Sequence, residues 1–196
     1  MDERPAMTPE QALVDVTGRL TRLGVRHALV GGLAVSIRAE VRFTRDVDLA
    51  IAVDSDADVE RITRALAAEG FALVAVVEQD ERKRIAIARL RSPSGIVVDL
   101  LAASSGIEHE IVGAARETAE LPGVPVAMPE HLLAMKVLSM RDARLQDRID
   151  ARGLLATGPV DLAEVRRLLS LIEARGFGRG QDLGAKLDEL IAQPTE

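Results

Sequence analysis

Two aspartates, Asp46 and Asp48, stand two positions apart at the start of an apolar run, DVDLAIAV, that covers residues 46–53. Alternate residues of a β-strand point to the same face, so this spacing predicts that the two carboxylates converge. Converging carboxylates repel each other unless a cation lies between them. Hard oxygen ligands with open coordination positions suit Mg²⁺, and Mn²⁺ is the alternative ion. Taken alone, the pair could equally be a solvated strand end.

A third carboxylate, Asp99, lies within another apolar run, IVVDLL, at residues 96–101. A carboxylate among apolar strand residues needs a partner, a cation or a functional reason, because burying an isolated charge is strongly unfavourable. Asp99 is therefore a candidate third metal ligand, or the base that orients and deprotonates an attacking hydroxyl. The simpler alternative is a strand-edge residue that forms an ion pair with an arginine.

A glycine pair, Gly31 and Gly32, follows a predicted strand and precedes a predicted helix. Bare glycine backbone lets a phosphate approach closely, and a helix N-terminus supplies free N–H groups. Together with the carboxylates, the pair predicts a site for phosphoryl transfer from a nucleoside triphosphate. Four residues after the glycine pair are candidate contacts to phosphate or acceptor: Ser36, Arg38, Arg42 and Thr44. Thr44 could instead cap the local turn.

Lys136 is one of only three lysines among 25 basic residues. Its compact charge can meet a phosphate. Asp147 and Asp150 lie three positions apart on one face of a predicted helix, so both could orient Lys136 or nearby arginines around the phosphates. The alternative is a plain surface lysine, with the two aspartates in surface ion pairs to Arg144 or Arg148.

The elements that must position these residues follow from hydrophobic periodicity and turn signals. Residues 106–127 show a mixed pattern, and only helices are expected after them. We therefore expect an α/β region over residues 1–128 and a helical region over residues 129–196 packed on it. Strands are predicted at residues 26–30, 46–53, 71–77, 84–90 and 96–101, the last two as a hairpin, and helices at 8–23, 33–39, 58–69, 129–140, 145–155, 162–174 and 182–191.

Composition excludes several classes of function. The chain has 196 residues, a formal net charge of −6 and no cysteine, so disulfides, thiolate metal sites and thiol nucleophiles are ruled out. Three phenylalanines are the only aromatic residues, which argues against base-stacking platforms, and the acidic balance argues against holding nucleic acid by bulk charge alone. No apolar run is long enough for a membrane span, and the first residues are too polar for a secretory signal. We expect a cytoplasmic protein with no membrane partner.

The glycine pair, the Asp-x-Asp and the later Asp99 resemble the signature of the nucleotidyltransferase superfamily of DNA polymerase β type. More closely, the chain resembles the AbiEii toxin group, which includes the MenT mycobacterial toxins. That group reads Gly-Gly-x-Ala, then Arg-x-Thr-x-Asp-Ile-Asp-Leu. The matching residues, with Val47 in place of Ile, are Gly31, Gly32, Ala34, Arg42, Thr44, Asp46, Asp48 and Leu49.

The same group carries a lysine on a later helix that begins with Pro-Glu, followed by an Arg/Lys-Asp-x-x-Asp pattern. Here Pro129 and Glu130 begin the segment that contains Lys136. Asp147 and Asp150 match the second pattern, with Gln146 in place of its basic residue. The resemblance covers residues 29–155.

This resemblance implies an α/β fold, a nucleotidyltransferase-type mixed β-sheet with flanking helices, followed by a C-terminal helical bundle. It implies metal-dependent transfer of a nucleoside monophosphate from an NTP to an acceptor. For MenT-like toxins that acceptor is the 3′ end of tRNA, and an antitoxin protein is the usual partner. The implied site has Asp46, Asp48 and Asp99 on the metal, Gly31, Gly32 and Lys136 on the triphosphate, and Asp147 or Asp150 in support of Lys136.

Two alternatives share this fold. One is a nucleotidyltransferase that modifies a small molecule, of the aminoglycoside-modifying type. The other is a catalytically silent protein that only binds a nucleotide or a partner. The presence of all three acidic positions argues against the silent protein.

Overall fold

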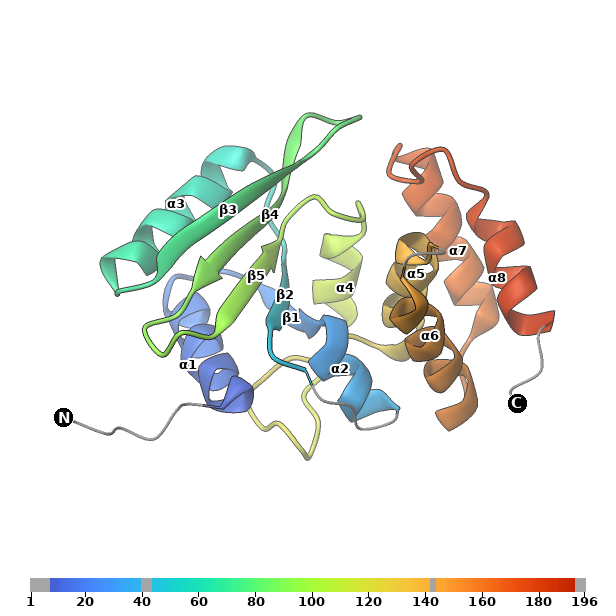
Figure 1. Cartoon of the computed structure of the whole chain (residues 1–196), viewed down its shortest axis with the longest axis horizontal. Helices are drawn as coiled ribbons and strands as arrows, with labels where there is room; N and C mark the ends of the chain where they lie inside the picture. Colours follow the sequence, from blue (N-terminus) through green and yellow to red (C-terminus); the bar gives the residue numbers. More distant parts are fainter. Residues whose placement is uncertain (1–7, 40–43, 142–143, 193–196) are drawn as a thin grey trace.

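Five strands form one mixed sheet in the order β1-β2-β5-β4-β3 (Figure 1). The computed structural model describes residues 8–39, 44–141 and 144–192. Only β2 and β5 pair in parallel, and the other neighbours are antiparallel. The five predicted strands and the β4–β5 hairpin are confirmed, with these bounds: β1 (His27–Val30), β2 (Val47–Ile51), β3 (Ala72–Gln79), β4 (Arg84–Arg91) and β5 (Val97–Leu101).

The seven predicted helices are present, and one further helix, α4, lies in the stretch interpreted as mixed. α4 has seven residues, too few for a clear helical period. Its start is fixed instead by Glu108, whose Oε1 accepts hydrogen bonds of 2.7–3.0 Å from the backbone N–H groups and hydroxyls of Ser104 and Ser105. The helices are α1 (Pro9–Arg22), α2 (Gly31–Arg38), α3 (Asp56–Ala68), α4 (Glu108–Ala114), α5 (Pro129–Ser139), α6 (Leu145–Thr157), α7 (Leu162–Ala174) and α8 (Leu183–Ala192).

The helices divide between the sheet and a bundle at one end of the molecule. α1, α3 and α4 pack on strands, whereas α5, α6, α7 and α8 pack on one another, on the right in Figure 1. α2 contacts β1 and β2 on one side and α5 and α6 on the other, so it joins the two parts. Buried apolar residues from both parts form one continuous core, and the division into 1–128 and 129–196 stays a prediction.

The junction between β1 and α2 needs glycine. The strand passes into the helix with no loop, and Gly31 takes a left-handed φ of +65°. A Cβ atom on Gly31 would lie 2.5 Å from the Cγ atom of Asp48. Glycine therefore supplies both the backbone conformation and the space that Asp48 occupies.

No helix in the described part of the chain is both long enough and apolar enough to cross a bilayer.

Candidate active site

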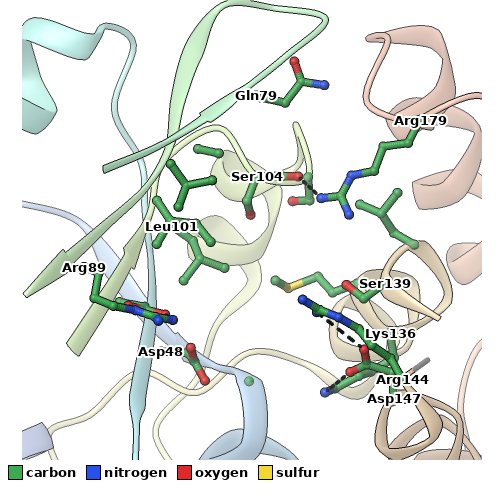
Figure 2. Close-up of a pocket in the computed structure, with 18 of the residues that line it drawn as sticks. Asp48, Gln79, Arg89, Leu101, Ser104, Lys136, Ser139, Arg144, Asp147 and Arg179 are labelled. Carbon is green, nitrogen blue, oxygen red and sulfur yellow. Dashed lines mark hydrogen bonds and ion pairs between the residues drawn. The ribbon is translucent and has the colours of Figure 1, made fainter. Parts of the chain in front are cut away.

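Three charged side chains form a row across the sheet. The β2–β5 register places Asp48 opposite Asp99, and the β4–β5 register places Arg89 opposite Asp99. Side chains at paired positions of neighbouring strands lie on the same face. Asp46 stands one residue before β2 and is exposed. All four residues line one cavity of about 760 Å³, and we call this side of the cavity the sheet wall (Figure 2).

Asp48 carries a charge that nothing in contact neutralises. In the described residues, no basic group lies within 4.0 Å of its carboxylate. Burial raises the pKa of Asp48 to about 6, and the charges of Asp99 and Asp46 add to that rise. Lys136 and a backbone hydrogen bond from Gly32 act in the opposite direction. Asp48 is thus a buried carboxylate poised to gain from a cation.

Asp99 already has a partner. Its side chain is 7% exposed, and its Oδ1 and Oδ2 atoms accept hydrogen bonds of 2.8 and 2.7 Å from the Nε and Nη2 atoms of Arg89. This contact raises the pKa of Arg89. The ion pair with an arginine, the simpler alternative from the sequence, is therefore present. A metal at Asp99 would have to share the carboxylate with Arg89, and that role stays a prediction.

The donor set fits an ion that arrives with further ligands. Across the part of the chain that the structure describes, no three carboxylate or imidazole groups are close enough to form a metal site by themselves. Asp46 and Asp48 could supply two hard oxygen ligands. Mg²⁺ keeps several water molecules and takes phosphate oxygens in such sites, so two carboxylates are sufficient protein ligands.

Lys136 lies opposite, on the helical wall of the same cavity. We use this name for the cavity lining contributed by α5, α6 and the α7–α8 connection. The Lys136 Nζ atom is 2.9 Å from Asp147 Oδ1 and 2.7 Å from Asp150 Oδ2. The exposed fractions of these three side chains are 12%, 13% and 1%, so the plain surface alternatives are wrong for Lys136 and Asp150. Arg144 approaches Asp147 only to 3.9 Å. Gln146 donates to Asp150, at 2.8 Å.

The remaining predicted contacts separate into two groups. Gly31, Gly32 and Thr44 line the cavity. Ser36 and Arg38 are not among its described lining residues. The Ser36 hydroxyl donates to the Gly32 carbonyl at 3.0 Å, and the Arg38 Nε and Nη2 atoms donate to the carbonyls of residues 127 and 126 at 3.1 and 3.3 Å. Arg42 lies outside the described residues.

Four arginines of the cavity were not predicted from the sequence. Arg89 lies in the predicted hairpin, but counting back from the turn at residues 92–95 pairs it with Val98, and the observed register, shifted by one residue, places it opposite Asp99. The other three lie on the helical side: two in the short α5–α6 connection between Lys136 and Asp147, and one in the α7–α8 connection. They are Arg141, Arg144 and Arg179.

A glycine-started helix, an Asp-x-Asp at the start of β2 and a third aspartate on the parallel neighbour β5 form the arrangement expected from the resemblance to nucleotidyltransferases. The comparison with family models gives the same answer. The model described as nucleotidyl transferase AbiEii toxin, type IV TA system, matches residues 20–194, and the chain belongs to this family. It is therefore an enzyme of the nucleotidyltransferase class, in a toxin–antitoxin family.

Solved structures share the fold at low sequence identity. An antigenic nucleotidyltransferase-like protein from Paracoccidioides brasiliensis is 22% identical, with 91% of each chain covered and a TM-score of 0.52. The lincosamide antibiotic adenylyltransferase LnuA, solved with lincomycin, is 14% identical over 77% of this chain and 99% of its own, with a TM-score of 0.54. ANT(2")-Ia with adenylyl-2"-tobramycin is 12% identical over 85% and 97%, with a TM-score of 0.52. No curated protein matches the sequence significantly.

Proposed function

We propose that this enzyme uses a divalent metal ion to move a nucleoside monophosphate from an NTP to the 3′ end of tRNA, as the toxin of a toxin–antitoxin pair. One observation carries the metal and nucleotide part. An uncompensated carboxylate, Asp48, and an enclosed cation, Lys136, line the same cavity, and the Lys136 charge lowers the pKa of Asp48. NTP and tRNA place the reaction in the cytoplasm, and a cognate antitoxin is the expected protein partner.

In this proposal, Asp46 and Asp48 hold Mg²⁺, or Mn²⁺, together with phosphate oxygens of the NTP. The ion supplies charge stabilisation where negative charge develops on the phosphates. Lys136 meets the triphosphate from the helical wall, and the backbone at Gly31 and Gly32 leaves room for the phosphates beside Asp48. Asp147 and Asp150 fix the Lys136 ammonium, so the cation is oriented before the nucleotide arrives.

The transfer step has a simple balance. The acceptor hydroxyl oxygen bonds to the α-phosphorus, the bond from that phosphorus to the β-phosphate oxygen breaks, and pyrophosphate leaves. Asp99 is the candidate to orient the hydroxyl and take its proton. Arg89 donates to both Asp99 oxygens, so in this proposal it positions the carboxylate. One of these hydrogen bonds must break during the step, so that the freed Asp99 oxygen can take the proton.

The test is incubation with NTPs labelled on the α-phosphate, each with deacylated tRNA. We expect label on the tRNA 3′ end with wild-type protein and Mg²⁺, and none with Asp48→Ala or with EDTA. Transfer by Asp48→Ala at the wild-type level would overturn the metal assignment. If no NTP labels tRNA, tRNA is not the acceptor.

A small-molecule acceptor is the second candidate, and one feature favours it. The end of the β3–β4 hairpin brings the carboxylates of Glu78, Asp80 and Glu81 to the cavity, where a cationic antibiotic could bind. LnuA and ANT(2")-Ia, which share the fold, were solved with an antibiotic or an adenylylated antibiotic. Lincomycin and tobramycin in the same labelling assay distinguish this candidate, since label would appear on the drug and not on tRNA.

A further inference from the structure

Five cations form a continuous line from the cavity across the helical bundle. Arg141, Arg144 and Arg179 line the main cavity. Arg141, Arg148 and Lys186 line a second cavity of about 180 Å³ between α6 and α8. Because Arg141 lines both cavities, these five residues form one surface, which we call the cationic track.

Two of the five track cations form ion pairs within the part of the chain that the structure describes. Arg179 Nη2 donates to the Ser104 carbonyl at 3.1 Å, and Lys186 Nζ donates to the Met140 carbonyl at 2.7 Å, so both bind neutral oxygens. Within the described residues, no carboxylate lies within 4.0 Å of Arg141, Arg179 or Lys186. The other two members have long ion pairs, 3.9 Å from Arg144 to Asp147 and 3.5 Å from Arg148 to Glu189.

The track cations also repel one another. Partial burial lowers the pKa of Arg179, and the charges of Arg141 and Arg144 lower it further. Burial, then Arg141, Arg179 and Arg148, lower the pKa of Lys186. The chain has a net charge of −6, yet among the described residues only Asp147 and Glu189 form ion pairs with the track. Such a concentration of cations is stabilised when an anion binds.

Arg179 carries its charge at a position whose backbone conformation is unfavourable for arginine. Its φ is +55°, in the left-handed region where glycine is favoured, and glycines stand on both sides of it. A third glycine would fit this backbone better. The arginine instead extends its guanidinium across the upper part of the cavity to Ser104 (Figure 2).

The track is a poor fit for the triphosphate alone. Lys136 is the helical-wall cation whose charge reaches Asp48. Burial and the charges of Arg141 and Arg144 lower the pKa of Arg179, whereas the charge of Glu81, at the end of the β3–β4 hairpin, raises it. The track also continues beyond the main cavity into the second one, away from the sheet. Its length and charge fit a chain of phosphates that extends out of the active site.

We propose that Arg141, Arg144, Arg148, Arg179 and Lys186 bind the phosphate backbone of a single-stranded RNA end and lead its terminal hydroxyl to Asp46 and Asp48. This inference rests on the proposed nucleotidyl transfer, to which it adds the route of the acceptor. Recognition through phosphates suits a chain whose only aromatic residues are three phenylalanines. A polycationic antibiotic would be repelled by the same surface.

The decisive measurement is the salt dependence of RNA binding, because it needs no transfer reaction. The probe is a short fluorescent RNA that ends in CCA, titrated by anisotropy at several KCl concentrations. The test variant combines Arg141→Ala with Arg179→Gly, since glycine accepts the left-handed backbone. The control combines Arg22→Ala with Arg64→Ala, two arginines with side chains 66% and 77% exposed on α1 and α3, which removes the same charge elsewhere.

We expect the slope of log Kd against log salt concentration to fall by about 0.7 for each lost phosphate contact, so by about 1.4 in the test variant. RNA affinity at low salt falls about 10- to 100-fold, and the control stays within about twofold of wild type. Affinity for an unreactive NTP analogue with Mg²⁺ also stays within about twofold, since Lys136 and the sheet wall are intact.

Three results would overturn the proposal. One is a test variant that binds RNA like the control. Another is an equal loss of NTP affinity, which would assign the track to the triphosphate. The third is wild-type protein that transfers label to tobramycin and does not bind the RNA, as expected for a cationic acceptor. If Arg179→Gly disturbs thermal unfolding, Arg141→Ala alone decides, with an expected slope change of about 0.7. Failure of the proposed transfer shows separately, as wild-type protein that neither binds NTP nor transfers label.

Discussion

The two walls of the cavity handle charge in opposite ways. On the sheet wall, no cation of the described residues contacts the Asp48 carboxylate, and burial raises the pKa of Asp48 to about 6. On the helical wall, Lys136 is enclosed with two carboxylates, Asp147 and Asp150, at 2.9 and 2.7 Å. Lys136 therefore has its counter-charges without a ligand, whereas the described residues supply no contacting cation to Asp48, because Arg89 on the same wall is paired with Asp99. The difference indicates that the cation needed at Asp48 comes with the substrate.

This contrast predicts opposite effects for the same kind of substitution. Removing the charge of Lys136 takes away the cation that two enclosed carboxylates share, and breaking such a contact is strongly destabilising. Removing the charge of Asp48 relieves a repulsion that the fold otherwise sustains. Each wall can thus be tested through stability as well as through activity.

The largest effect is expected from Lys136→Met. We expect it to lower the free energy of unfolding by about 3 kcal/mol or more, because Asp147 and Asp150 lose their shared cation. Urea unfolding followed by circular dichroism measures this loss. The triple variant Lys136→Met, Asp147→Asn, Asp150→Asn is the control, and it should recover most of the stability since no unpaired charge remains. If the triple variant is as unstable as Lys136→Met, packing and not charge holds this wall together.

Asp48→Asn should act in the other direction. The folded pKa of about 6 lies above the ordinary aspartate value of 3.8, so ionisation of Asp48 destabilises the metal-free fold as the pH rises through this range. At about pH 8 without metal, the variant should be more stable than wild type by up to about 3 kcal/mol, and at pH values well below 4 the two should agree. Urea unfolding in EDTA at both pH values measures the difference. Equal stability of the two proteins at the higher pH would show that the ionised Asp48 carboxylate does not destabilise the fold.

How far the sequence could predict these walls depends on the distance between partners. The Asp-x-Asp spacing and the apolar run around Asp99 are local, and the register of β2 with β5 brings Asp48 and Asp99 together as expected from converging strands. The hairpin places Arg89 near Asp99, but the exact pairing depends on a register that differs by one residue from the count through the turn at residues 92–95.

Side chains whose partners lie far along the chain could not be placed from local pattern. Arg38 follows the glycine pair by only six residues, yet it donates to backbone carbonyls at residues 126 and 127 and does not line the cavity. Arg179 reaches the cavity only because the α7–α8 connection packs near Ser104. Helix and strand periodicity report on burial, and neither specifies which distant backbone atom a long side chain will meet.

Magnesium should stabilise the wild-type protein in a way that depends on Asp48. Binding of an ion to the folded state alone raises stability by about 2.7 kcal/mol at a concentration 100 times its Kd. We expect a rise in the unfolding temperature on addition of Mg²⁺ at about pH 8, a smaller rise well below pH 6 where Asp48 is protonated, and none in Asp48→Asn. Differential scanning fluorimetry measures all three. An equal Mg²⁺ effect in Asp48→Asn would place the ion elsewhere.

The smallest effect, and the sharpest test of the sheet wall, is expected from Arg89→Gln. Arg89 is half exposed, so loss of its hydrogen bonds to Asp99 should cost about 1 kcal/mol. The same change removes a cation beside three carboxylates, so Mg²⁺ should bind more tightly. Transfer should become slower, because Asp99 is no longer held in place. Mg²⁺ titration of the unfolding temperature and kcat for label transfer separate the two consequences. Weaker Mg²⁺ binding in Arg89→Gln would mean that Arg89 organises the metal ligands, and that the sheet wall is not simply short of positive charge.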